Sequence, residues 1–167
     1  MSGRGTQVLA LQGIDQNGGL ITLNDGTFDN NGNAMTNTAE GRITGHGVLN
    51  TGGLDNEGKV ILAGDQSTIN GEVANKADGE IEVAHGHALF NDKVSNEAGA
   101  TFKTTEAEVT FAGGFANSGH YYSDPSTQHF TDLTVNPTGY LTAGKGDEFY
   151  ISGDFINYSI MNEEWNT

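Results

Sequence analysis

Residues 75–83 read NKADGEIEV and residues 96–104 read NEAGATFKT, so one short pattern occurs twice in close succession. Each copy begins with an asparagine, has a glycine within the next four residues, and continues as a run that alternates small or polar with apolar residues. Alternation with a period of two is typical of a β-strand with one buried face. A pattern that recurs at a fixed spacing indicates a repeat architecture in which each unit is one small structural element.

The same spacing extends along most of the chain. Eight asparagines begin the units, at steps of 19 to 21 residues: Asn17, Asn37, Asn56, Asn75, Asn96, Asn117, Asn136 and Asn157. We expect them to stack at one corner as a ladder of side-chain amides, where asparagine and the glycine after it accept left-handed backbone geometry. Six residues before three of these asparagines stand Phe90, Phe111 and Phe130, which predicts an aromatic column in the core.

The composition favours an all-β fold. The 167 residues include 25 Gly, 2 Pro and no Cys, and no long stretch repeats its apolar residues with the helical period. A unit of about 20 residues cannot bury its apolar face alone, so the units must stack. The prediction is a single parallel β-helix, or β-solenoid, of about eight coils, right-handed because parallel crossover connections usually are.

The repeats also set the predicted boundaries. Residues 13–160 form the solenoid, and residues 161–167 are the truncated start of a further coil. Residues 1–12 are either introduced by cloning or a first partial coil, since MSGRGTQ lacks the apolar segment of a signal peptide.

Charge and hydropathy exclude several partners. Seven Lys and Arg residues stand against 22 Asp and Glu, a formal net charge of −15, so no basic surface exists for nucleic acid. No apolar run is long enough to predict a membrane span. The absence of Cys excludes disulfides and thiol chemistry.

Histidines are weak candidates for a metal site. His85 and His87 are two residues apart, which would place them on one face of a strand. Counting forward from each asparagine puts His87, Glu108 and His129 in one column, whereas aligning Phe130 with Phe111 removes His129 from it. We prefer the phenylalanine alignment, because a core position constrains strand register more than a surface position does. The resulting expectation is an ordinary solvated face without a metal.

Acidic residues raise the question of calcium. The stretch AGKGDEFYISGDF, residues 143–155, contains Asp147 and Asp154, which are weak candidates for calcium ligands. Its spacing is not that of an EF-hand or of a nine-residue calcium repeat. We expect no cofactor, and we leave open weak calcium binding to the acidic surface as a whole.

An enzyme is not expected. The chain has two arginines, Arg4 and Arg42, and no Gly-x-Ser-x-Gly or phosphate-binding loop. In HYYSDPSTQHF, residues 120–130, Tyr121 and Tyr122 must point to opposite faces, and we interpret Pro125 as part of a turn rather than of a ligand-binding bump. The alternative is a carbohydrate-binding or carbohydrate-processing β-helix, which would line one groove with exposed aromatic residues and carboxylates.

The repeat units resemble a known class of protein. NTAEGRITG, NEGKVILAG, NKADGEIEV, NEAGATFKT and NSGHYYSD, with the closing GDEFYISGDFINYS and NEEWNT, are similar to the Asn-x-x-Gly repeats of secreted bacterial β-solenoids. These occur in autotransporter and filamentous-haemagglutinin-type passengers, and the chain looks closest to extracellular proteins exported with a PEP-CTERM sorting tail. The resemblance covers roughly residues 15–160.

What the resemblance implies is an extracellular or cell-surface protein with a structural or adhesive role. Its partners would be exopolysaccharide, the cell surface or further copies of itself. Because open ends of a solenoid pair with other strands unless capped, we also expect end-to-end assembly into filaments.

Overall fold

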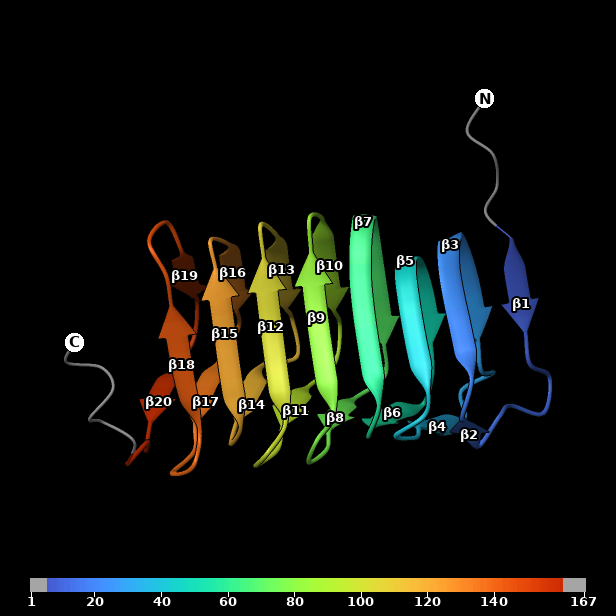
Figure 1. The fold of residues 1–167 in the computed structure, drawn as a ribbon, viewed down its shortest axis with the longest axis horizontal. Helices are drawn as coiled ribbons and strands as arrows, with labels where there is room; N and C mark the ends of the chain where they lie inside the picture. The colour runs from blue at the N-terminus through green and yellow to red at the C-terminus, as the bar shows by residue number, and fades with distance from the viewer. Residues whose placement is uncertain (1–5, 161–167) are drawn as a thin grey trace.

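The chain forms a parallel β-solenoid, as the repeats predict. A computed structural model describes residues 6–160, and the predicted further coil at 161–167 lies outside them. All twenty strands of this part pair in parallel, in one 12-stranded and one 8-stranded sheet. They stack in about seven turns spaced by about 21 residues, one turn fewer than expected (Figure 1).

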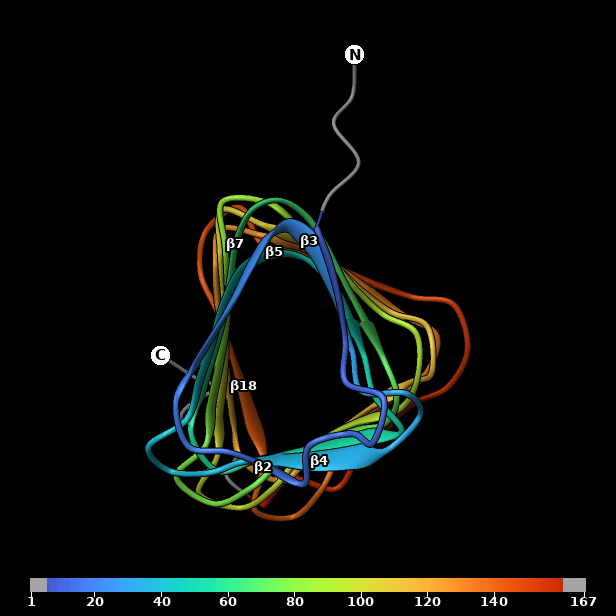
Figure 2. The same cartoon turned by 90° about the vertical axis from the view of Figure 1, so that its right-hand side faces the viewer.

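Each turn has three sides, which give the coil a triangular cross-section (Figure 2). The base is the 8-stranded sheet: β2 (Gln16–Asn17), β4 (Ala34–Asn37), β6 (Gly53–Asn56), β8 (Val73–Asn75), β11 (Val94–Asn96), β14 (Phe115–Asn117), β17 (Leu133–Val135) and β20 (Phe155–Asn157). The 12-stranded sheet supplies the other two sides, called here the front face and the rear face.

The long strands β3 (Leu20–Asp29), β5 (Arg42–Asn50) and β7 (Lys59–Asn70) run through both of these faces. The front face continues with β9 (Glu80–Ala84), β12 (Thr101–Thr105), β15 (His120–Asp124) and β18 (Tyr140–Ala143). The rear face has β1 (Gln7–Leu9), β10 (His87–Phe90), β13 (Glu108–Phe111), β16 (Thr127–Phe130) and β19 (Glu148–Ile151). β1 pairs with β3, so residues 7–9 add a short strand to the first described turn.

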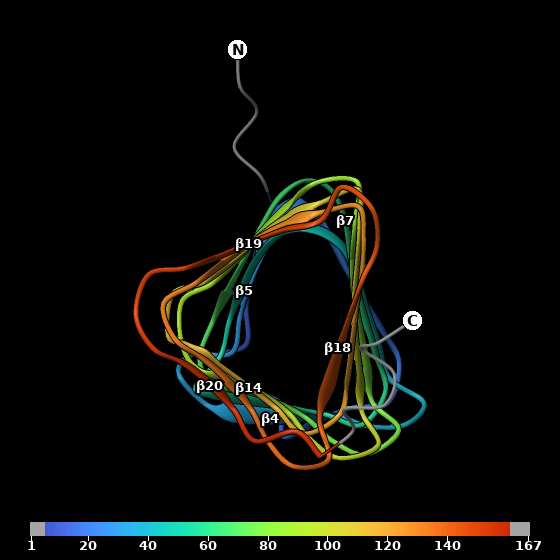
Figure 3. The ribbon, with the colours of Figure 1, turned by 90° about the vertical axis from the view of Figure 1, so that its left-hand side faces the viewer.

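The coil is right-handed. Seen from its C-terminal end, each turn passes counterclockwise from the front face to the rear face while the chain advances toward the viewer (Figure 3). The predicted hand agrees with this view.

The upper ridge, where the front face meets the rear face, changes along the molecule. In the first turns the long strands bend there through irregularities next to Gly26 and Gly47. From the fourth coil onward, a short connection between two strands replaces the bent long strand at the ridge. In it His85 and Glu106 have φ angles of 53° and 47°. Such angles are uncommon outside glycine, so the later turns bend at a local conformational cost.

The interior is a continuous apolar core. Phe90, Phe111 and Phe130 are buried and stack in register on the rear face, with ring centroids 5.3 Å and 4.8 Å apart. Phe102 and Tyr121 form a second stack, 5.3 Å apart, and both meet the ring of Phe111 edge-on. Each such contact adds about 0.5–1.5 kcal/mol beyond area burial, so the later turns have the aromatic part of the core.

The asparagine ladder runs along the base. The side-chain amide of each asparagine donates to the amide oxygen of the next one, over 2.7–2.9 Å, from Asn17 through Asn37, Asn56, Asn75 and Asn96 to Asn117. The second N–H of Asn75 donates to the carbonyl of Thr101, and that of Asn96 to the carbonyl of His120. These buried amides are therefore satisfied both along the ladder and toward the front face.

The ladder ends earlier than the sequence predicts. Val135, not Asn136, pairs with Asn117 on one side and Asn157 on the other. Asn136 lies one residue further on and donates to the hydroxyl of Ser118. The prediction was wrong at Asn136 because the residue stacked on Asn117 follows it by 18 positions, which makes it Val135. Counting from one asparagine to the next gives 19 positions and therefore ends one residue too far.

The corner geometry also differs from expectation. The ladder asparagines have no positive φ; they are needed for their amides. Gly79 likewise has no positive φ, but an added Cβ there would overlap the carbonyl oxygen of Asn56 in the turn below. At this corner the left-handed residue is Asp78, and at the same corner of the next turn it is Gly99. Close approach of neighbouring turns thus explains Gly79, while backbone angle explains Gly99.

No helix of the described residues is long and apolar enough to cross a membrane.

Candidate functional site

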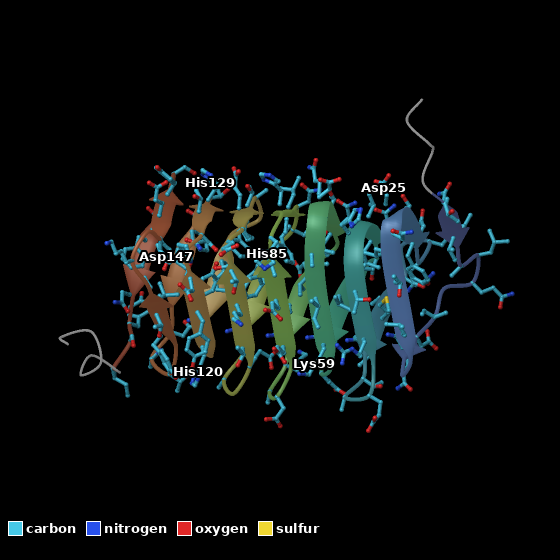
Figure 4. The ribbon with its side chains drawn as sticks, turned by 45° about the horizontal axis from the view of Figure 1, so that its top comes forward. Asp25, Lys59, His85, His120, His129 and Asp147 are labelled. Atoms are coloured by element: carbon cyan, nitrogen blue, oxygen red, sulfur yellow. The ribbon has the colours of Figure 1, made fainter. Side chains whose placement is uncertain are left out.

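His85 and His87 do not share a strand face, contrary to expectation. His85 lies in the turn of the upper ridge (Figure 4). His87 is the first residue of β10. His85 Nδ1 lies 2.9 Å from an oxygen of Glu106 in the next turn, and both side chains are more than 60% exposed. Residues two apart share a face only in an extended strand. The positive φ of His85 interrupts the extended backbone, so its side chain points elsewhere than that of His87.

His87, Glu108 and His129 come together in spite of the register. Strand pairing places His87 directly beside Glu108, while His129 pairs with Thr110, two residues along β13, as the phenylalanine alignment predicts. Glu108 nevertheless contacts both imidazoles, with one oxygen 3.2 Å from His87 Nδ1 and the other 3.4 Å from His129 Nε2. Side-chain length therefore restores a contact that the register alone would remove.

Asp147 has a structural role in the last described turn. Its carboxylate accepts hydrogen bonds from the Ser123 hydroxyl and from the backbone N–H groups of Ser126 and Gly144. Three donors already satisfy this carboxylate, which favours a loop brace over a calcium ligand. Asp154 lies at the other end of β19, where its backbone N–H donates to Asp132. The two aspartates are therefore not brought together.

Beneath Asp147 lies a buried polar cluster that sequence reasoning missed. Gln128 donates to the hydroxyls of Thr104 and Ser123, and all three side chains are buried. The Tyr121 hydroxyl and the Gln128 carbonyl oxygen are buried without a hydrogen-bond partner. Burial raises the pKa of Tyr121 well above its usual range. Polar residues at three alternating inward positions, on β12, β15 and β16, are the sequence signal for this cluster.

Lysines bridge neighbouring turns on the surface. Lys59 contacts Glu80 at 2.6 Å, and Lys76 lies between Glu97 at 2.8 Å and Asp55 at 3.5 Å. The hydrogen bond to Glu97 raises the pKa of Lys76, with a smaller contribution from Asp55. Exposed pairs of this kind stabilise by at most about 1 kcal/mol each.

Aromatic side chains gather on the front face near the C-terminal end. His120 Nδ1 lies 3.0 Å from the Tyr122 hydroxyl and 2.8 Å from the Tyr140 hydroxyl. Tyr121 is fully buried and its neighbour Tyr122 is 36% exposed, which confirms that the pair points to opposite faces. Pro125 lies between β15 and β16, in a turn, as predicted.

Carboxylates line a different part of the surface. A shallow hollow of about 370 Å³ on the base is lined by Asp15, Asp55, Glu72 and Lys93, together with small residues and the edges of the core. No aromatic residue lines it. The aromatic cluster of the front face and this carboxylate-lined hollow thus lie on different faces and do not form one groove.

A second asparagine ladder runs beside the rear face. Asn91 donates to Asn70 and Asn70 to Asn50, both over 2.6 Å. These residues are spaced by 20 and 21 positions, so the sequence contained the signal, but they are outside the Asn-x-x-Gly motif and were missed. Unlike the ladder of the base, this one lies at the surface.

In comparisons with known proteins, no family model, curated protein or solved structure matches the chain.

Proposed function

We propose that the protein is a non-catalytic structural or adhesive β-solenoid of a bacterial cell surface or extracellular matrix, and that copies associate end to end. Membership of the secreted Asn-x-x-Gly solenoids, and the extracellular location that goes with it, are parts of this proposal. The support for both is the set of repeat units, which form a rod in which the buried residues pack coil upon coil.

One observation supports the end-to-end contact above all others. On the base, the inward column contains Phe115 and Leu133, exposed by 3% and 1%, and then Phe155 in the last described turn, exposed by 53%. At the opposite end, Val8 lies in the inward column of Phe28 and Leu49 and is 51% exposed. The described solenoid thus presents core-type side chains at both ends.

The backbone favours the same contact. In the described residues, β18, β19 and β20 each pair on one side only, and so do β1 and β2 at the other end. Unpaired parallel strands accept a further strand of matching spacing, and a head-to-tail contact that does not close extends into a filament.

The test compares two variants with similar side-chain changes at different places. We expect the parent chain to lengthen along its axis with rising concentration and salt, as seen by electron microscopy and analytical ultracentrifugation. Phe155→Asp should abolish this growth, because it places a charge in the contact, whereas Tyr122→Asp on the front face should not. Particles of one length under all conditions would refute end-to-end association, and loss of growth in Tyr122→Asp alone would indicate lateral association instead.

A carbohydrate-binding β-helix is the second candidate. It is favoured by the partly exposed cluster of His120, Tyr122 and Tyr140, because aromatic rings can stack on sugar rings. Titration with acidic and neutral polysaccharides, using Tyr122→Ala as the comparison, would test it. Binding that is unchanged in this variant, or no binding at all, would leave the structural role.

A further inference from the structure

We propose that His87, Glu108 and His129 form a surface site for a divalent transition-metal ion of the zinc type. The site would span three consecutive turns of the rear face, on β10, β13 and β16. It is independent of end-to-end association, since none of the three residues belongs to the terminal turns.

The contacts of Glu108 carry the inference. One carboxylate lies between two imidazoles and touches each with a different oxygen, at 3.2 Å and 3.4 Å. The ring nitrogens that face it, Nδ1 of His87 and Nε2 of His129, are the atoms through which neutral histidine binds a metal. Two imidazoles and one carboxylate form a ligand set that suits zinc and its neighbours rather than calcium, which prefers oxygen alone.

The surrounding residues keep the three ligands close to one another. Parallel pairing fixes His87 beside Glu108, and His129 stacks on Tyr150 with ring centroids 5.1 Å apart and planes 13° from parallel. Within residues 6–160, the only ion-pair partners of Glu108 are the two histidines. No lysine or arginine therefore has to be displaced for a cation to approach.

The local charge favours a cation as well. Glu148 lies further along the outward column that contains His87 and Glu108, and Glu106 lines a hollow together with both of them. The chain as a whole has a net charge of −15, which raises the local concentration of cations.

Binding requires the side chains to rotate. Within the described residues, no group of three histidine, aspartate or glutamate side chains is placed, as it stands, to hold a metal ion. The side chains of His87, Glu108 and His129 are 65%, 48% and 41% exposed, so each can turn toward a shared ion without displacing the core. The ion would lie between the two imidazoles, where the carboxylate of Glu108 now lies, and the carboxylate would bind the ion from the side.

Calorimetric titration with Zn²⁺ tests the site, in excess calcium so that diffuse binding to acidic residues is suppressed. We expect one saturable event in the parent chain, weakened about tenfold or more in His87→Ala, in Glu108→Gln and in His129→Ala. The matched control is His85→Ala, since His85 also pairs with a glutamate and is as exposed as His87. It should bind as the parent does, and circular dichroism should show that all variants are folded.

Two results would overturn the proposal. One is the absence of a saturable event in the parent chain under these conditions. The other is binding that survives both His87→Ala and His129→Ala, or that disappears only in His85→Ala, because the ion would then lie elsewhere.

Discussion

Val135 interrupts a chain of amides that otherwise continues from turn to turn. It occupies the inward position between Asn117 and Asn157, and it is 1% exposed. Asn117 therefore has no amide above it and donates to the carbonyl of Tyr140. A buried amide is stable only where hydrogen-bond partners satisfy it. Position 135 should therefore tolerate substitution by asparagine, whereas the positions of other buried valines should not.

Val135→Asn is the substitution that tests this point, with Val60→Asn as its control. Val60 is equally buried but lies between Ile43 and Ile81, so an amide there has no partner. We expect Val60→Asn to lower the free energy of unfolding by more than about 2 kcal/mol, and Val135→Asn to change it by less than about 1 kcal/mol. Denaturant unfolding measures both, and equal losses would show that the ladder does not extend to this turn.

Tyr121 predicts a loss of stability in alkali. Burial raises its pKa in the folded state, so the folded protein holds the phenolic proton more strongly than the unfolded chain does. This contribution is complete below the unfolded pKa of about 10 and is lost as the pH rises above it. Tyr121→Phe should remove that loss at little cost at neutral pH, because the buried hydroxyl makes no hydrogen bond of good geometry. Unfolding curves across this pH range check it, and Tyr122→Phe should retain the alkaline loss.

At the scale of the element, the close approach of neighbouring coils decides where glycine is required. Gly86 lies between His85 of the ridge and His87, the first residue of β10, and an added Cβ would overlap the carbonyl oxygen of Gly64 in the turn below. Its φ is not in the left-handed region, so the requirement is space rather than backbone angle. Neighbouring strands can then keep their pairing on both sides of the ridge.

Gly86→Ala should therefore separate the two turns locally and destabilise the protein by about 1–3 kcal/mol. Gly19→Ala is the matched control, because an added Cβ there meets nothing within 4 Å. Thermal melting compares the two variants. A loss of stability in Gly19→Ala as large as in Gly86→Ala would mean that glycine flexibility, not space, is what matters.

At the scale of the whole molecule, charge opposes compactness. The net charge of −15 acts on a single rod, and the lysines that bridge turns neutralise only part of it. Repulsion among exposed carboxylates falls with ionic strength, because the screening length shortens to about 8 Å at about 0.15 M salt.

Added sodium chloride should therefore raise the melting temperature, although it weakens the surface ion pairs. Calcium at the same ionic strength should have nearly the same effect, since Asp147 is satisfied by protein donors and Asp154 is not beside it. Differential scanning calorimetry with the two salts checks this. Stabilisation by micromolar calcium that sodium chloride does not reproduce would reveal a dedicated calcium site.

Much of the fold could be predicted from the sequence. The period of the asparagines and phenylalanines was sufficient for the parallel solenoid and for the column of Phe90, Phe111 and Phe130, because a stacked repeat places equal positions one above another. The count failed at Asn136, where a turn of different length moved the inward position to Val135.

The sequence by itself determined the inward face of most strands, since alternation along a strand leaves two choices and burial of apolar groups selects one. It did not predict the buried polar residues Thr104, Ser123 and Gln128. Only the tertiary structure decided which side chains meet across turns, because such contacts depend on register, turn length and side-chain reach together. Glu108 between His87 and His129, and Asp147 above Ser123, are contacts of this kind. Local spacing cannot contain them, since each joins residues of different turns that are more than 20 positions apart. The contact of Glu108 with His129 also crosses a shift of two residues in register.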